Sequence, residues 1–455
     1  MANAAQNIIQ PNYIKEGTLN KLTSQSIYLV YITIVGFIFV DLPLEQYFGT
    51  IARCPNLITA PFIFIYLQAN LKQIVPVKLA KYYFNYSIIS TVASLLMLFI
   101  TVAFVTQGSW YVYAEFMPVK LVKAAAYNFV NALTIYNLYV LFKFITLEQL
   151  YKVLFYCLAF LTIYGLVEMF IDYPIPGIHG TIVTDDNKRL QLTTPEPVTA
   201  TIVYSIFLSL VLYLRSYLKK VVFFTIVLAI VGLFLLLAIG SKGGVIFLVL
   251  SILLSIRKKL NFKVVILALI TIVPIVYVIF ETIVPMLLVD IEGFTSFSTR
   301  TSTWLAAFAG LIYYPIGQGF GTYLVYYPPL MIPTCKWFSS VIGIPLNTSE
   351  MEYYIQIGKY LGAKSGVPNE VMFNGIPALV YLYLICKYHV QRLKQLPKRT
   401  INILFSFIYY FIFFEFLFIV TLETTYYIFL PILLIDRLLN EYPLDRKVKI
   451  IETEN

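Results

Sequence analysis

The chain carries little charge for its length. Only 12% of its 455 residues are charged, whereas 60% are hydrophobic, and the mean hydropathy is +0.81. So few charged residues cannot cover that much apolar surface in water, which excludes a soluble globular fold. In a bilayer, every backbone polar group must be satisfied within the spanning segment, which favours helices of roughly 20 apolar residues. We therefore expect an all-α integral membrane protein.

Cysteine and histidine are also scarce. The four cysteines are scattered without a CxxC pair, and the two histidines, His179 and His389, do not accompany them. This pattern argues against a zinc site or a redox motif. We expect the cysteines to behave as small hydrophobic residues; a disulfide between Cys54 and Cys335, both in connections expected outside, is the alternative.

No removable signal peptide is expected, because the first 25 residues are polar and offer no apolar core followed by a small-residue cleavage site. Long apolar runs do follow, each bounded by Pro, Gly or charge. They begin near Ser26, Leu57, Tyr86, Ala124, Tyr151, Thr199, Val221, Gly244, Val264, Asn374, Ile401 and Thr425. The sequence thus predicts a polytopic helix bundle of about twelve transmembrane helices. The second run is the weakest, because it contains Pro61 and is short for the hydrocarbon thickness.

Most of the 33 Lys and Arg residues fall in alternate connections between these runs, whereas the other connections have few. The richest connections span about residues 72–81, 143–152, 215–220, 257–263 and 387–399. By the positive-inside rule, these connections and both ends of the chain are expected in the cytoplasm. The net charge of +10 then reports topology and gives no reason to expect nucleic acid as a partner.

The predicted organisation has one outstanding feature, a long external connection. The segments are a cytoplasmic tail at 1–25, helices 1–9 within 26–283 with an external loop at about 172–198, the large external loop at 284–373, helices 10–12 within 374–437, and a tail at 438–455. Long loops that carry aromatic and patterned sequence are usually functional. Within the large loop we predict an amphipathic helix at Thr301–Tyr313, a glycine-rich turn at Pro315–Gly321 and a helix around Glu350–Leu361. These elements would form a cap over the bundle.

Three cations stand at the expected outer mouth of the bundle, where cations are rare. They are Arg189 in DDNKRLQLTTPEPVTA, Lys242 in AIGSKGG and Arg300 in FSTRTSTWLAAFAG. Together they suit a diphosphate, because Arg offers a planar fork to two phosphate oxygens and Lys a compact point charge. The alternative is that Lys242 and Arg300 extend to the headgroups of the outer leaflet.

The turn GSKGG between two apolar helices, followed by RTSTWLAAFAGLIYYPIGQGFG, resembles the O-antigen ligase and polymerase superfamily. RLQLTTPEPVTATIV and PNEVMFNGIPALVYLYLICKY are similar to two further stretches of that family, so the resemblance covers roughly residues 185–390. Lys242 stands where the family usually has Arg, which keeps the charge and loses the bidentate geometry. The large external loop also lacks the histidine that the ligases carry, which favours a polymerase.

The resemblance implies a glycosyltransferase that lengthens a surface polysaccharide (O-antigen, capsule or exopolysaccharide) at the outer face of the bacterial cytoplasmic membrane. Its partners would be polyprenyl-diphosphate-linked oligosaccharide donor and acceptor, membrane lipid and a chain-length regulator protein, and it would need no cofactor or metal. Arg189, Lys242 and Arg300 would bind the diphosphate. Arg300 would act in catalysis, with Glu350 or Glu352 helping to deprotonate the attacking sugar hydroxyl.

Other interpretations remain at this stage. One is an O-antigen ligase, and another is a lipid-linked oligosaccharide flippase or transporter, which would be expected to show two related halves and a charged midplane. A third is a metal-dependent transferase that uses external acids. The acids concerned are Asp41, Glu45, Asp185 and Asp186. For the carboxylate that deprotonates the sugar hydroxyl, Glu196, Glu370 and Glu423 are further external candidates that spacing alone does not rank against Glu350 and Glu352.

Overall fold

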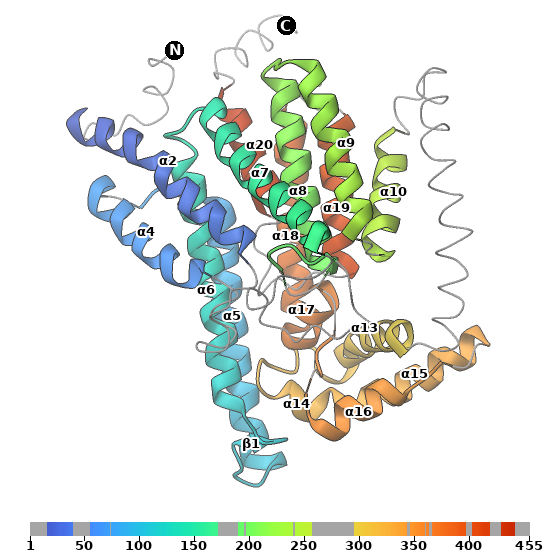
Figure 1. Cartoon of the computed structure of the whole chain (residues 1–455). Helices are drawn as coiled ribbons and strands as arrows, with labels where there is room; N and C mark the ends of the chain where they lie inside the picture. Colours follow the sequence, from blue (N-terminus) through green and yellow to red (C-terminus); the bar gives the residue numbers. More distant parts are fainter. Residues whose placement is uncertain are drawn as a thin grey trace, which may run out of the picture.

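The structure is a computed structural model that describes residues 16–39, 55–72, 74–171, 190–194, 197–239, 242–256, 295–343, 346–359, 361–363, 366–396, 403–418 and 429–441. Apart from one short hairpin, the regular elements in these residues are helices (Figure 1). The bundle comprises α2 (Glu16–Ile38), α4 (Asn56–Leu71), α5 (Lys78–Ile100) with its π-helical continuation η2 (Thr101–Val105), α6 (Met117–Leu141), α7 (Leu147–Ile171), α8 (Pro197–Tyr217), α9 (Val222–Ile239), α10 (Lys242–Ile256), α18 (Ile376–Gln395), α19 (Ile403–Phe418) and α20 (Leu430–Glu441). The remaining elements are the hairpin β1 (Tyr111–Val112) and β2 (Glu115–Phe116), and α13 (Thr295–Tyr313), α14 (Tyr323–Tyr326), α15 (Pro328–Ile342), α16 (Ser349–Ile357) and α17 (Gly366–Asn374).

Four helices among the described residues are long and apolar enough to cross a membrane. They are Lys78–Val105, formed by α5 and η2, and the helices α7, α8 and α9. Shorter apolar helices lie at Ser24–Ile38, Asn56–Leu71, Ile246–Ser255 and Ser406–Glu415. The all-α fold is therefore confirmed, and the length and composition of these helices are consistent with a membrane protein. The count of about twelve spans stays a prediction, and the run near Val264 lies outside the described residues.

Helix α6 differs from the four long apolar helices because several of its buried side chains are polar. It packs along α5 and α4, and it buries Asn128, Asn131 and Asn137 completely. The amide of Asn137 donates to the carbonyl oxygen of Ala60 in α4 at 2.8 Å, so at least one of these polar groups joins two helices. Helix α8 is the central helix, with 78% of its apolar window buried, whereas α9 buries 22% and lies at the edge.

Helices α13–α16 form the cap, which lies with the hairpin at one end of the bundle (Figure 1). The cap has a hydrophobic core of its own that includes Phe320, Tyr327 and Met351. The ends of α5 and α6 next to the hairpin contribute Leu98 and Leu121 to this core. The cap is thus packed onto the bundle through α5 and α6.

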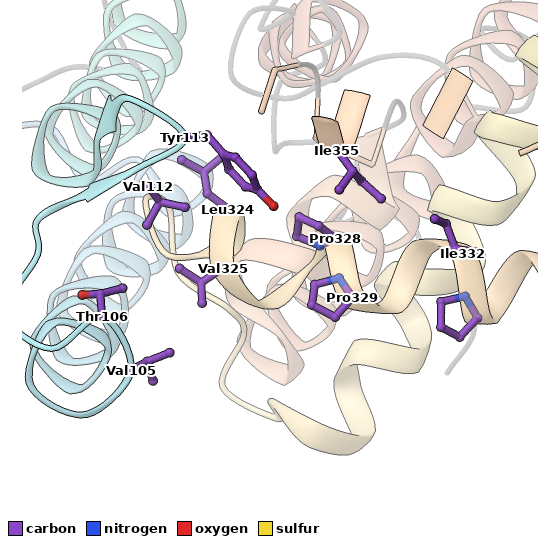
Figure 2. Close-up of a pocket in the computed structure, with 11 residues that line it drawn as sticks. Val105, Thr106, Val112, Tyr113, Leu324, Val325, Pro328, Pro329, Ile332 and Ile355 are labelled. Atoms are coloured by element: carbon purple, nitrogen blue, oxygen red, sulfur yellow. The ribbon is translucent and has the colours of Figure 1, made fainter. Parts of the chain in front are cut away.

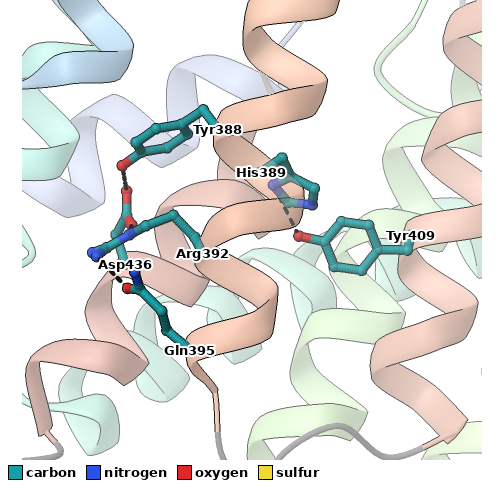
Figure 3. Close-up of polar contacts among 6 residues, drawn as sticks. All are labelled: Tyr388, His389, Arg392, Gln395, Tyr409 and Asp436. Atoms are coloured by element: carbon teal, nitrogen blue, oxygen red, sulfur yellow. Dashed lines mark hydrogen bonds and ion pairs between the residues drawn. The ribbon is translucent and has the colours of Figure 1, made fainter.

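Polar side chains join α18 to α20 (Figure 3), and α20 lies at the end of the bundle away from the cap (Figure 1). Asp436 in α20 accepts hydrogen bonds from Tyr388 at 2.8 Å and Arg392 at 2.5 Å, both in α18. Arg437 donates to the carbonyl oxygen of Ile145, in the connection between α6 and α7. Lys143 lies in the same connection, so residues from two of the cation-rich connections, Lys143 and Arg392, lie at this one end.

The cap contains helices at both positions expected from the sequence, together with the short α14 and the longer α15, which were not expected. Helix α13 starts six residues before Thr301, and α16 covers Ser349–Ile357. Helix α15 was missed because three prolines made its sequence look like a loop. Pro328 and Pro329 occupy its first turn, where a backbone N–H has no helical partner in any case, and only Pro333 lies inside the helix.

Candidate functional site

Helix α13 carries Arg300 at the surface of the cap. Its neighbours Ser298 and Thr299 are buried, as are Ala306 and Ala307 further along the helix, and α13 packs against α15 and α17. The Arg300 side chain is exposed. Arg300 is therefore exposed next to the face of α13 that packs against α15 and α17.

Helix α16 places Glu350 directly beside this part of α13. The Thr299 hydroxyl donates to Glu350 Oε2 at 2.7 Å, and the Tyr354 hydroxyl donates to Glu350 Oε1. One residue earlier, the Ser298 hydroxyl donates to the carbonyl oxygen of Asn347 at 2.6 Å. Residues 51 positions apart are thereby joined, and Arg300 and Glu350 are brought to the same region of the cap.

Glu352 has a different environment from Glu350. Its side chain is exposed, and its Oε1 accepts a hydrogen bond at 2.8 Å from Thr348, the N-cap residue of α16. That bond is local to the start of the helix. Of the two carboxylates singled out in the sequence, Glu350 is therefore the one that contacts α13.

The side chains of the other two predicted diphosphate ligands are not among those the structure describes. Arg189 is outside the described residues, and Lys242 begins α10 without a described side chain. The segment that follows Arg189 is held by Glu168 of α7, whose carboxylate accepts the backbone N–H groups of Gln191 at 3.0 Å and Leu192 at 2.9 Å. Convergence of the three cations stays a prediction.

The glycine-rich turn that follows α13 is a junction between backbones. Gln318 N donates to Met372 O at 2.9 Å, and Ile376 N donates to Pro315 O at 2.8 Å. Gly317 has φ +91°, and a Cβ there would lie 2.2 Å from Phe373 O, well inside van der Waals contact. The glycines allow the turn to lie directly against the break between α17 and α18, and through this junction α13 is fixed to the bundle.

Glu370 was one of several external acids that the sequence did not rank as the catalytic carboxylate. The structure sets it apart by burial and hydrogen bonds. It lies in α17 and is only 1% exposed. The Tyr86 hydroxyl of α5 donates to Glu370 Oε2, and Asn374 Nδ2 donates to the Tyr86 hydroxyl at 2.7 Å. The Tyr86 ring stacks on Tyr381 of α18 with centroids 4.3 Å apart. The available signal was the four-residue spacing of Glu370 and Asn374, which puts two polar groups on one helix face.

A buried tyrosine links α13 to the cap core. The Tyr327 hydroxyl donates to the carbonyl oxygen of Thr303, one turn beyond Arg300. Burial raises the pKa of Tyr327 well above its usual value. The phenol therefore stays a neutral donor and keeps the Arg300 segment in place.

Within the described residues, no three His, Cys, Asp or Glu side chains lie close enough to hold a metal ion. The acids Asp41, Glu45, Asp185 and Asp186, which the metal-dependent alternative would use, lie outside the described residues. No family model, curated protein or solved structure matches the chain. The candidate site is therefore in the cap, where the cation of Arg300 and the hydrogen-bonded carboxylate of Glu350 lie on neighbouring helices.

Proposed function

We propose that the protein is a membrane glycosyltransferase that polymerises polyprenyl-diphosphate-linked oligosaccharide repeat units into a surface polysaccharide. The observation that carries the proposal is the pairing of α13 with α16, which presents Arg300 next to the residue that donates a hydrogen bond to Glu350. A cation for a diphosphate and an acceptor for a hydroxyl proton are the two groups this reaction needs.

In the proposed reaction, the acceptor sugar hydroxyl attacks the anomeric carbon of the donor. The new glycosidic bond forms there as the bond from that carbon to the diphosphate oxygen breaks, and its electron pair leaves with the diphosphate. Glu350 takes the hydroxyl proton, while Arg300 stabilises charge that grows on the leaving oxygen. Arg189 and Lys242 complete the proposed diphosphate site.

The proposed location is the bacterial cytoplasmic membrane, with the cap on the outer side. Two features support this orientation. Lys and Arg concentrate in the connections assigned to the cytoplasm, and Lys143, Arg392 and Arg437 lie together at the end away from the cap. An external cap is also where a lipid-linked saccharide that has crossed the membrane would be met.

The test is polymer length in cells that express Arg300→Ala. We expect polymerisation to fall by about 100-fold or more, because one charge-stabilising group is lost from the transition state. Arg300→Lys should recover part of the activity, since it keeps the charge without the planar fork. Lys336→Ala is the matched control, because Lys336 is also an exposed cation on the cap but belongs to α15 rather than to α13 or α16.

Long polymer at the wild-type level from Arg300→Ala, with normal amounts of protein in the membrane, would remove Arg300 from the mechanism. A reconstituted assay separates the alternatives to a polymerase. Vesicles with the purified protein and a labelled lipid-diphosphate oligosaccharide should give longer lipid-linked chains. Movement of the label between leaflets without growth would instead identify a transporter.

A further inference from the structure

An apolar groove of about 650 Å³ opens between the hairpin, η2 and the cap helices (Figure 2). Val105 of η2, Val112 and Tyr113 of the hairpin, and Val325 of α14 form part of its lining. Helix α15 contributes Pro329 and Ile332. This volume lies within the range of small-molecule sites in proteins, and the lining is mostly hydrocarbon, with Thr106 and Tyr113 as its hydroxyl-bearing residues.

One end of the groove lies beside the exposed apolar face of the helix Lys78–Val105. Val105 lines the groove and is also the last residue of the Lys78–Val105 helix. Next to it, Phe104 is 82% exposed and Phe99 is 61% exposed. Large exposed apolar side chains on a helix of this length face lipid, so hydrocarbon can enter the groove from the bilayer without crossing water.

The other end of the groove reaches the helix that carries Glu350. Ile355 of α16 lines the groove. It follows Glu350 by five positions in the same helix, which is about 7.5 Å along the helix axis at the usual rise per residue. An elongated molecule in the groove can therefore have its apolar part against lipid and its other end near the proposed site.

The hairpin that forms one wall is held in a strained conformation. Tyr113 and Ala114, at the tip of the hairpin, have φ of 51° and 61°, although neither is glycine. Both central residues of a two-residue hairpin loop take this left-handed conformation, which side chains other than glycine disfavour. The tip packs tightly on α16, because a Cβ on Gly358 would lie 2.1 Å from the Tyr113 Cβ.

We propose that this groove holds the isoprenoid chain of the polyprenyl diphosphate, with the diphosphate directed toward the face shared by α13 and α16. The inference rests on the proposed function. An isoprenoid fits better than a fatty acyl chain because the wall is rigid. Prolines and β-branched side chains have few conformations, and a chain stiffened by double bonds loses less freedom on binding such a wall.

The test uses purified wild-type protein in nanodiscs with two photoreactive probes. One is a polyprenyl diphosphate with a diazirine in its chain, and the other is a phospholipid with a diazirine in an acyl chain. The isoprenoid probe should label peptides that contain residues 105–113 and 323–333, and unlabelled polyprenyl diphosphate should remove that label. Labelling of the groove by the acyl probe alone, or isoprenoid labelling confined to other helices, would overturn the proposal.

A variant that fills the groove provides the second measurement. Ile332→Trp should lower isoprenoid labelling at least tenfold. Val341→Trp is the matched control, because it adds the same side chain to α15 at a position that is 62% exposed and outside the groove. Labelling by Ile332→Trp at the wild-type level would contradict the proposal, and loss of folding in this variant leaves the wild-type mapping to decide.

The labelling result and the polymer assay can fail independently. If the groove is labelled and competed while Arg300→Ala still makes long polymer, the lipid site stands and the proposed catalytic role falls. If Arg300→Ala loses polymer while the isoprenoid probe labels another surface, the proposed function stands and the groove is assigned wrongly.

Discussion

Glycine has two roles in the cap, and substitution can separate them. At Gly317 the backbone has positive φ and also meets another segment, because an added Cβ would lie 2.2 Å from Phe373 O. At Gly343, which ends α15, φ is +69° but nothing lies within 4 Å of the same position. Only the first glycine is required by contact between two parts of the chain.

Gly343→Ala should therefore lower stability by about 1 kcal/mol, the usual cost of a left-handed residue that is not glycine. Gly317→Ala should be much worse, because the turn must also separate from the end of α17, and we expect a loss of several kcal/mol or no folded protein. Thermal unfolding in one detergent, followed by size-exclusion chromatography, measures both. Equal midpoints for the two variants would show that the junction tolerates separation.

At the scale of the elements, Asp436 of α20 joins α18 through an ion pair with Arg392 and a hydrogen bond from Tyr388. The Arg392 and Asp436 side chains lie 2.5 Å apart, and they are 25% and 2% exposed. Burial lowers the pKa of nearby Lys143, while the charge of Asp436 acts to raise it. A second ion pair, between Lys220 and Glu148, also joins two segments at 2.6 Å, but its side chains are 34% and 39% exposed. Burial is the main difference between the two pairs.

Asp436→Ala should cost about 2–4 kcal/mol, because it leaves the guanidinium partly buried without its partner. Glu148→Ala should cost less than about 1 kcal/mol, since water already screens the pair. Unfolding midpoints of the single variants and of Asp436→Ala with Arg392→Met form the comparison. The double variant should be less damaged than the sum of its parts, and strict additivity would mean that the two side chains do not act together.

At the scale of the whole molecule, the cap and the polar network of α18 and α20 lie at different ends of one bundle (Figure 1). The proposed orientation, which follows the distribution of Lys and Arg, puts these ends on opposite sides of the membrane. Ser340 on α15 and Lys394 near the end of α18 are both exposed and represent the two ends.

In a cysteine-free background, Ser340→Cys should react with a membrane-impermeant maleimide in intact cells. Lys394→Cys should react only after the membrane is permeabilised. The two positions control for each other, because each must become reactive once both sides are accessible. Labelling of Lys394→Cys in intact cells would reverse the orientation, and the proposed external site would then have to be abandoned.

The sequence by itself determined the class of the protein. Its shortage of charge required burial in a bilayer, and apolar runs bounded by Pro, Gly and charge indicated helices, because backbone hydrogen bonds must close within each span. It also predicted α13 from Thr301 onward, without the first turns that include Arg300, and the turn that follows, since both depend on residues close together in the chain. Helix α15 was missed because local proline signals do not show whether prolines fall in a first turn.

Only the tertiary structure decided which distant residues meet. Glu350 differs from Glu352 in its contact with Thr299, and Glu370 is buried against Tyr86, although the sequence placed all three acids in the same external loop. The groove likewise combines the end of η2, the hairpin and three cap helices. Such contacts depend on how whole helices pack, and packing is set by the shapes of many side chains at once, which no local pattern encodes.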